Sequence, residues 1–209
     1  MTKFSGLLLL FSFQTSIPAQ TAVLNLDSTI KNGKSVEFLK FSGPGAFDSY
    51  LTMNLPFAPM KTLLQQVQTT ESVKLKDRGE AHITVVTPVE FWNDLKPYGV
   101  SIAEIDQIAE AMNIQNSAFQ IICLGAGKKV IEDREEKTFY VVVQSDDLLK
   151  IRRKVQELLL SKEGGRASNF NPTKFYSHIT LGYTLKDLHD SDGIIKDDKS
   201  CIHDIQLVN

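Results

Sequence analysis

Two of the four histidines in this 209-residue chain stand in identical His-Ile-Thr strings, at residues 82–84 and 178–180. Each string lies inside an apolar, β-branched stretch typical of a strand, where residues i and i+2 point to the same face. His82 and Thr84 are therefore expected to share one face of the sheet, and His178 and Thr180 to do the same. The intervening isoleucines should pack on the opposite face.

This set of side chains suits phosphodiester chemistry. One neutral imidazole can take a proton from an attacking water or hydroxyl, and the other, as imidazolium, can protonate the departing sugar oxygen. The threonine hydroxyls can donate hydrogen bonds to the non-bridging phosphate oxygens. The scheme requires no metal and no other cofactor, so none is expected. One such string is a weak signal, because a lone strand histidine is usually structural, but two copies on two predicted strands favour a functional pair.

The elements that must position these strings alternate along the chain. Apolar periodicity predicts helices over residues 59–68, 101–113 and 146–161. Alternating or β-branched runs predict strands over residues 50–56, 80–88, 119–125, 137–145, 176–184 and 201–208. Ser101 and Glu104 form the capping-box pattern at the start of the second helix, and residues 126–137 are expected to hold a charged turn with a short strand. Helices and strands thus interleave in two similar halves, which predicts one α/β domain with two lobes.

The strings around the histidines resemble a known superfamily. "RGEAHITVVTPVEF" and "FYSHITLGYT", with "ICLGAGK" and "YVVVQSDDLLKIRRKV" between them, are similar to the 2H (two-histidine) phosphoesterases, and most to their Swiss Army Knife RNA repair-like branch. The similarity runs from Tyr50 to Val208. It implies an α/β (α+β) fold, bilobal and duplicated, with antiparallel-rich sheets and flanking helices around a central groove.

The resemblance also implies an activity. It points to a metal-independent phosphodiesterase, a hydrolase acting on cyclic or 2′-5′-linked nucleotide or RNA phosphodiesters. It carries catalytic roles over to His82, Thr84, His178 and Thr180 alone. Which histidine is the base and which the acid stays open, because the two motifs are equivalent.

Three further side chains are candidates for supporting roles in the site, two of them in binding the substrate. Tyr176 shares the parity of the second motif, so it is expected to face the groove, where it could stack on a base. Arg78 and Glu80 share the parity of the first motif, and could meet a phosphate and orient an imidazole, respectively. Each of the three also has a structural interpretation as a rim or solvated residue. The basic run of residues 150–154 is expected to be a solvated helix face.

Two other classes of protein remain open. A catalytically silent protein could use the same groove to capture nucleotides or RNA. A metal hydrolase could use His82 and His178 as ligands, but zinc would need a third protein ligand and the sequence contains no HxxxH, HxH or CxxC pattern. His189 and His203 lack a threonine two positions later and are not expected to be catalytic.

Composition limits the kinds of partner. The chain is 42% hydrophobic and 23% charged, which is ordinary for a globular protein, and its formal net charge is −2. No global basic field exists to attract nucleic acid or an anionic membrane, so a phosphate must be held by a local site. The protein is expected to act as a monomer.

The first residues have the order of a secretory signal peptide. Lys3 precedes an uncharged apolar run, and Pro18 and Ala19 follow it. We expect residues 1–19 to be the signal, 20–49 a polar lead and 50–209 the 2H phosphoesterase-like domain. The apolar run is too short to span a bilayer comfortably, which takes about 20 residues, although an uncleaved anchor or a buried first helix remains an alternative.

Export predicts a secreted or periplasmic location, and an intracellular RNA-repair role fits that location poorly. In an oxidising compartment Cys123 and Cys201, the two cysteines of the chain, could form one disulfide. Two buried thiols are the alternative interpretation.

Overall fold

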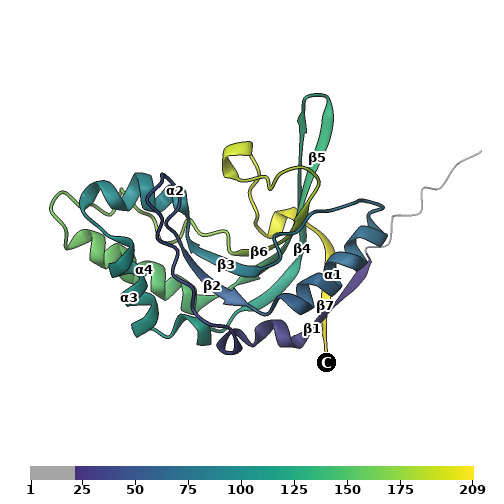
Figure 1. The fold of residues 1–209 in the computed structure, drawn as a ribbon, viewed down its shortest axis with the longest axis horizontal. Coiled ribbons are helices and arrows are strands. Elements are labelled where there is room, and N and C mark those ends of the chain that lie inside the picture. The colour runs from purple at the N-terminus through teal and green to yellow at the C-terminus, as the bar shows by residue number, and fades with distance from the viewer. Residues whose placement is uncertain (1–21) are drawn as a thin grey trace, which may run out of the picture.

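The computed structural model describes residues 22–209, so the expected signal peptide at residues 1–19 lies outside the described residues. Seven strands form one curled sheet in the order β1-β7-β4-β5-β6-β3-β2 (Figure 1). The strands are β1 (Val23–Asp27), β2 (Leu51–Leu55), β3 (Ala81–Val86), β4 (Gln120–Ile131), β5 (Arg134–Gln144), β6 (His178–Tyr183) and β7 (Cys201–Val208). All neighbours pair antiparallel except β1 and β7, which are parallel.

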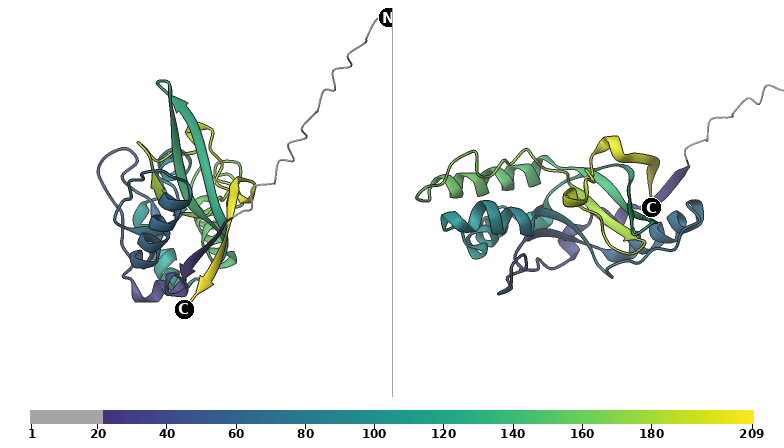
Figure 2. Two further views of the ribbon diagram at one scale, coloured as in Figure 1. Left: turned by 90° about the vertical axis from the view of Figure 1, so that its right-hand side faces the viewer. Right: turned by 90° about the horizontal axis from the view of Figure 1, so that it is seen from above.

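Four α-helices flank this sheet: α1 (Phe57–Thr70), α2 (Pro88–Glu90), α3 (Ile102–Ala111) and α4 (Asp146–Leu160). The short α2 continues into a π-helical turn over Phe91–Leu95. Helices α3 and α4 pack side by side at one end of the molecule, and α1 lies at the other (Figure 2). The predicted capping box is confirmed, because Ser101 Oγ accepts from the Glu104 amide and the Glu104 carboxylate accepts from the Ser101 amide.

The central four strands are arranged with an internal two-fold repeat. Strand β2, helix α1 and strand β3 follow one another in the chain, and so do β5, α4 and β6. Each motif-bearing strand pairs with the strand that precedes its helix, and the two motif strands pair with each other at the centre, in the order β5-β6-β3-β2. The expected α/β fold with antiparallel pairing and flanking helices is confirmed, and its two halves meet in one continuous sheet.

The hydrophobic core lies between the sheet and the helices. Ile83 and Ile179, the middle residues of the two His-Ile-Thr strings, are fully buried in it together with the apolar stripes of α1 and α4. Helix α1 contacts β6 and helix α4 contacts β3, so each half of the repeat covers the motif strand of the other half. Burial of these apolar faces fixes which side chains of the motif strands face away from the core.

Two segments differ from what the sequence predicts. Residues 126–137 continue the strands on both sides into one long hairpin, which turns at Glu132 and Asp133 with φ of 49° and 61° and stands above the rest of the fold (Figure 2). Such left-handed pairs are typical of tight two-residue hairpin turns. The expected polar lead at 20–49 contains β1, which completes the edge of the sheet by pairing with β7.

Cys123 and Cys201 form a disulfide with a Cα–Cα distance of 5.7 Å. The bond joins β4 to the first residue of β7. It therefore ties down the end of the long segment from Thr184 to Ser200 that follows the second motif strand. Of the two alternatives for these cysteines, the structure contains the disulfide.

Candidate active site

The two motifs lie side by side at the centre of the sheet. Strands β3 and β6 pair antiparallel with Ile83 opposite Ile179. Extending this register by one residue in each direction puts His82 opposite Thr180 and Thr84 opposite His178. Directly paired side chains in a sheet have Cβ atoms about 5 Å apart, and diagonal ones about 7 Å. The two histidines are therefore diagonal neighbours on one face, each next to the threonine of the other motif.

His178 is held in one tautomer by the backbone. Its Nδ1 lies 2.7 Å from the carbonyl oxygen of Tyr176. A carbonyl oxygen only accepts hydrogen bonds, so Nδ1 carries the proton and Nε2 is left as the acceptor of the neutral ring. Burial, reinforced by the positive charge of Lys196, lowers the pKa of His178 to about 3. At neutral pH this imidazole is an uncharged base.

His82 has a different electrostatic environment. Burial lowers the pKa of His82, but the nearby carboxylate of Glu80 opposes that shift. Glu80 Oε1 lies 3.5 Å from the Nδ1 atom of His82, whose side chain is 12% exposed. That nitrogen is buried and has no hydrogen-bond partner in residues 22–209. The charge of Asp187 acts on both imidazoles, but within residues 22–209 His82 is the one of the two with a carboxylate within 4 Å of a ring nitrogen.

A buried carboxylate, Asp187, connects the second motif to two cations. Its side chain is 4% exposed and accepts hydrogen bonds from Thr180 Oγ1 at 3.2 Å, Thr138 Oγ1 at 3.1 Å and Lys196 Nζ at 2.9 Å. Arg78 Nη2 also lies 3.0 Å from it. Burial by itself would raise the pKa of Asp187, but the neighbouring positive charges lower it. The carboxylate is therefore ionised and holds Thr180, Lys196 and Arg78 in one cluster.

Sequence reasoning missed Asp187 and Lys196. Both lie in the segment 184–200, whose sequence has no helical or strand periodicity. Their proximity to Thr180 of the second motif is therefore apparent only in the folded chain. Arg78, predicted as a phosphate contact, is part of this cluster with its side chain partly exposed. The Nε2 atom of His189 lies 3.8 Å from Asp187 Oδ2. His203, on strand β7, pairs with Glu71.

The prediction that residues 150–154 form a solvated face is wrong for Arg152. Its side chain is 1% exposed and pairs with Glu90 at 2.7 Å. It also donates to the carbonyl oxygen of Val85 at the end of the first motif strand, and packs against the rings of Phe170 and Phe175. Arg152 is a structural anchor between α4 and β3.

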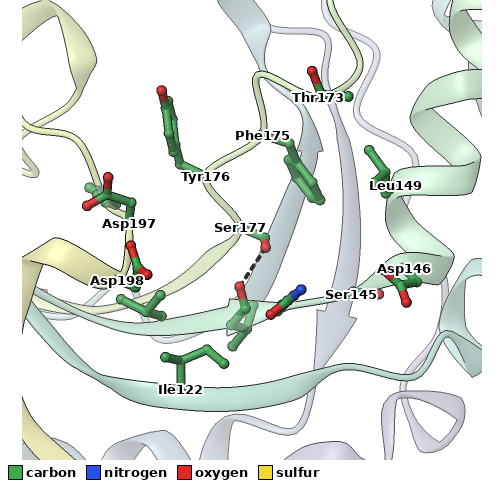
Figure 3. A pocket seen from close by; sticks show the side chains of 14 residues that line it. Ile122, Ser145, Asp146, Leu149, Thr173, Phe175, Tyr176, Ser177, Asp197 and Asp198 are labelled. Atoms are coloured by element: carbon green, nitrogen blue, oxygen red, sulfur yellow. Dashed lines mark hydrogen bonds between the residues drawn. The ribbon is translucent and has the colours of Figure 1, made fainter.

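A cavity of about 420 Å³ is lined in part by Tyr176 and Ser177, the two residues before His178 (Figure 3). Tyr176, predicted as a base-stacking residue, lies on its wall, and the Ser177 hydroxyl donates to the carbonyl oxygen of Val143.

Within residues 22–209 no group of three or more histidine, cysteine, aspartate or glutamate side chains has the arrangement of a metal site. None of the helices that the structure describes is long and apolar enough to cross a membrane.

Fold and site together define an α/β phosphoesterase with paired His-x-Thr strands. Residues 49–189 match the family model described as Swiss Army Knife, 2H phosphoesterase domain. This match covers more than half of the chain, and the protein belongs to the Swiss Army Knife family of 2H phosphoesterases. Comparison with curated proteins and with solved structures gives no significant match. The family assignment confirms the resemblance and supports phosphoesterase activity in general terms.

Proposed function

We propose that the protein is a metal-independent phosphodiesterase acting on cyclic or 2′-5′-linked nucleotide or RNA phosphodiesters. The observation that carries the proposal is the pairing of Ile83 with Ile179, which gathers His82, Thr84, His178 and Thr180 on one face. A separation of about 7 Å between the diagonal histidines leaves room for one phosphoryl group between the rings. Two imidazoles on opposite sides of a phosphorus atom suit an in-line displacement.

The two histidines differ in the role that their surroundings favour. His178 has a free Nε2 lone pair and a cation, Lys196, that disfavours its protonation, so it acts as the general base. His82 has the Glu80 carboxylate beside Nδ1, so it acts as the general acid through its other nitrogen. A bound diester adds a negative charge between the rings, which raises the pKa of both. Glu80 then gives His82 the stronger preference for the charged form.

In the proposed reaction a water molecule gives a proton to Nε2 of His178 while its oxygen bonds to phosphorus. The bond between phosphorus and the leaving sugar oxygen breaks, and His82 protonates that oxygen. The products are a phosphomonoester and a free hydroxyl group. The two histidines have then exchanged protonation states, and they return to the starting state by exchange with solvent.

Three side chains are suited to hold the phosphoryl oxygens. Thr84 Oγ1 has no hydrogen-bond partner within residues 22–209 and can donate to the substrate, while Thr180 Oγ1 must turn from Asp187 toward it. The Arg78 side chain is partly exposed and adds a positive charge next to Asp187. Hydrogen bonds from these groups strengthen as charge develops on the non-bridging oxygens, which lowers the barrier.

The test is hydrolysis of a panel of 2′,3′-cyclic nucleotides and of 2′-5′- and 3′-5′-linked dinucleotides in EDTA. Release of a phosphomonoester in EDTA supports the proposal. Activity that EDTA abolishes and zinc restores would identify a metal hydrolase instead. Binding of these compounds without turnover would identify the alternative, a catalytically silent nucleotide- or RNA-binding protein that uses the same groove.

A location outside the cytosol is part of the proposal. The Cys123–Cys201 disulfide supports it, because such bonds persist in oxidising compartments and are rare in the reducing cytosol. A secreted or periplasmic enzyme would act on extracellular nucleotides or RNA fragments.

A further inference from the structure

The cavity that Tyr176 and Ser177 line lies on the motif face of the sheet, next to His178 in the chain. Val142 pairs with His178 across strands β5 and β6, so both side chains point to the same face, and Val142 lines the cavity. Tyr176 and Ser177, the two residues before this histidine, form another part of the wall. A substrate whose phosphate lies at the histidines can therefore extend a neighbouring group into the cavity.

The cavity has an apolar floor that is partly open to solvent. Ile122 is 37% exposed although its side chain is aliphatic, and Leu149 and the ring of Phe175 lie nearby (Figure 3). Tyr176 adds a second aromatic ring to the wall (Figure 3). A volume of about 420 Å³ lies within the usual range of small-molecule sites. Such a surface suits a flat heteroaromatic ring.

Carboxylates stand at two sides of this floor. Asp146, in the first turn of α4, is on one side, and Asp197 and Asp198 are on the other (Figure 3). In the described chain neither Asp146 nor Asp198 forms an ion pair or a side-chain hydrogen bond. Lys196 also lines the cavity, but its side chain is 2% exposed and its ammonium group is paired with Asp187. The rim therefore offers hydrogen-bond acceptors and repels anions.

These features separate the two ends of a substrate. A phosphate is repelled by the acidic rim and stays with Thr84 and Arg78, whereas a neutral ring with N–H donors is attracted to the rim. Guanine, adenine and cytosine carry amino groups on their edges. Uracil instead has a single ring N–H flanked by two carbonyl oxygens, and the carboxylates would be opposed by those oxygens. Guanine has two adjacent N–H donors, which is the geometry that binds one carboxylate through both oxygens.

We propose that this cavity is the nucleobase subsite and that it selects amino-bearing bases, guanine foremost, over uracil. The proposal rests on the proposed function in that the cavity receives the base of a substrate whose phosphate lies at the two histidines. It goes beyond that function by naming which nucleotides are preferred and by assigning the preference to Asp146 and Asp198.

The experiment compares kcat/KM for guanosine and uridine 2′,3′-cyclic monophosphate, whose phosphates and sugars are identical. We expect the wild-type enzyme to favour the guanosine substrate about tenfold, the discrimination that one good bidentate contact gives. Asp198→Asn and Asp146→Asn should each lower that ratio at least about threefold, because each loses an acceptor for guanine and removes a charge that opposes the carbonyl oxygens of uracil. Asp133→Asn, at the tip of the β4–β5 hairpin and not among the residues that line the cavity, is the matched control and should keep the wild-type ratio. Equal kcat/KM for the two substrates would overturn the proposal, as would an unchanged ratio in both cavity variants.

If neither the cyclic nucleotides nor the linked dinucleotides are hydrolysed, the proposed function fails and the subsite is tested by binding. Titration calorimetry with guanosine and uridine 3′-monophosphate then measures the same preference without turnover. Tighter binding of the guanosine ligand that weakens in Asp198→Asn would support the subsite. Equal dissociation constants would contradict it.

Discussion

Ile83 lies directly opposite Ile179 where the two motif strands pair, and each is the middle residue of a His-Ile-Thr string. Both isoleucines are fully buried on the core face, so the histidines and threonines on either side of them must project to the other face. An antiparallel pairing centred on these residues brings each histidine next to the opposite threonine. Antiparallel pairing of two identical His-Ile-Thr strings is therefore enough to place both histidines and both threonines on the same face of the sheet.

Protonation of His178 should make the fold sensitive to acid. Because the folded pKa is about 3 and an unperturbed histidine titrates near 6.5, the unfolded chain binds more protons between these values. The stability that neutral His178 contributes is therefore complete above pH 6.5 and is lost progressively as the pH falls toward 3. Urea unfolding at pH 7 and pH 4.5 should show that the wild-type protein loses on the order of 2 kcal/mol more than His178→Gln. An equal loss in both proteins would contradict the low pKa.

The buried pair of Asp187 and Lys196 should be strongly coupled. Asp187→Asn leaves the Lys196 ammonium buried without a charged partner, which should lower the free energy of unfolding by about 3–5 kcal/mol. The double variant Asp187→Asn/Lys196→Met removes both charges and should recover part of that loss. Chemical denaturation of the two single variants, the double variant and the wild type measures the coupling. Additive losses would show that the two charges do not stabilise each other.

The disulfide should stabilise the segment that carries both of these residues. Cys123→Ala/Cys201→Ala releases a loop closed over a sequence separation of 78 residues, and loss of a native disulfide typically costs about 2–5 kcal/mol. The melting temperature of the variant should therefore fall, and treatment of the wild type with a reducing agent should lower it similarly. A reducing agent that leaves the wild-type melting temperature unchanged would argue against this bond in solution.

Export gives a prediction about the mature chain. N-terminal sequencing of protein purified from its native host should begin near Gln20, just before strand β1 starts at Val23. Cleavage here would leave the edge strand of the sheet intact. A mature protein that retains Met1 in the cytosol would refute the signal peptide and the proposed location.

Local patterns predict most of the fold that positions the site. Alternation at His82, Ile83 and Thr84 predicts which face each side chain takes, and the capping box predicts the start of α3. Strand β1 was missed because it is short and gains its stability from parallel pairing with β7, at the other end of the chain. Such a contact leaves no periodic signal in its own segment.

Arg152 and Asp187 illustrate two different limits of sequence reasoning. Arg152 stands at helical spacing with Leu148 and Val155 on the buried stripe of α4, so its burial could have been predicted from position, against its charge. Asp187 lies in an irregular segment, and its partners Arg78, Thr138 and Lys196 are brought together only by the tertiary fold. Its role beside Thr180 has no local signature.

The central claim is that His82 and His178 act as a pair of proton-transfer groups. The most direct measurement is single-turnover and steady-state hydrolysis of a 2′,3′-cyclic nucleotide in EDTA. The proteins compared are the wild type, His82→Ala, His178→Ala and the double variant. His203→Ala is the control for loss of a histidine outside the site. Each single variant at the site should lower kcat by about 10²–10⁴-fold, the range for removal of one general acid or base. The double variant should lose far less than the product of the single losses, because residues that act as a unit are not additive. Near wild-type turnover by a folded His178→Ala protein would contradict the two-histidine mechanism.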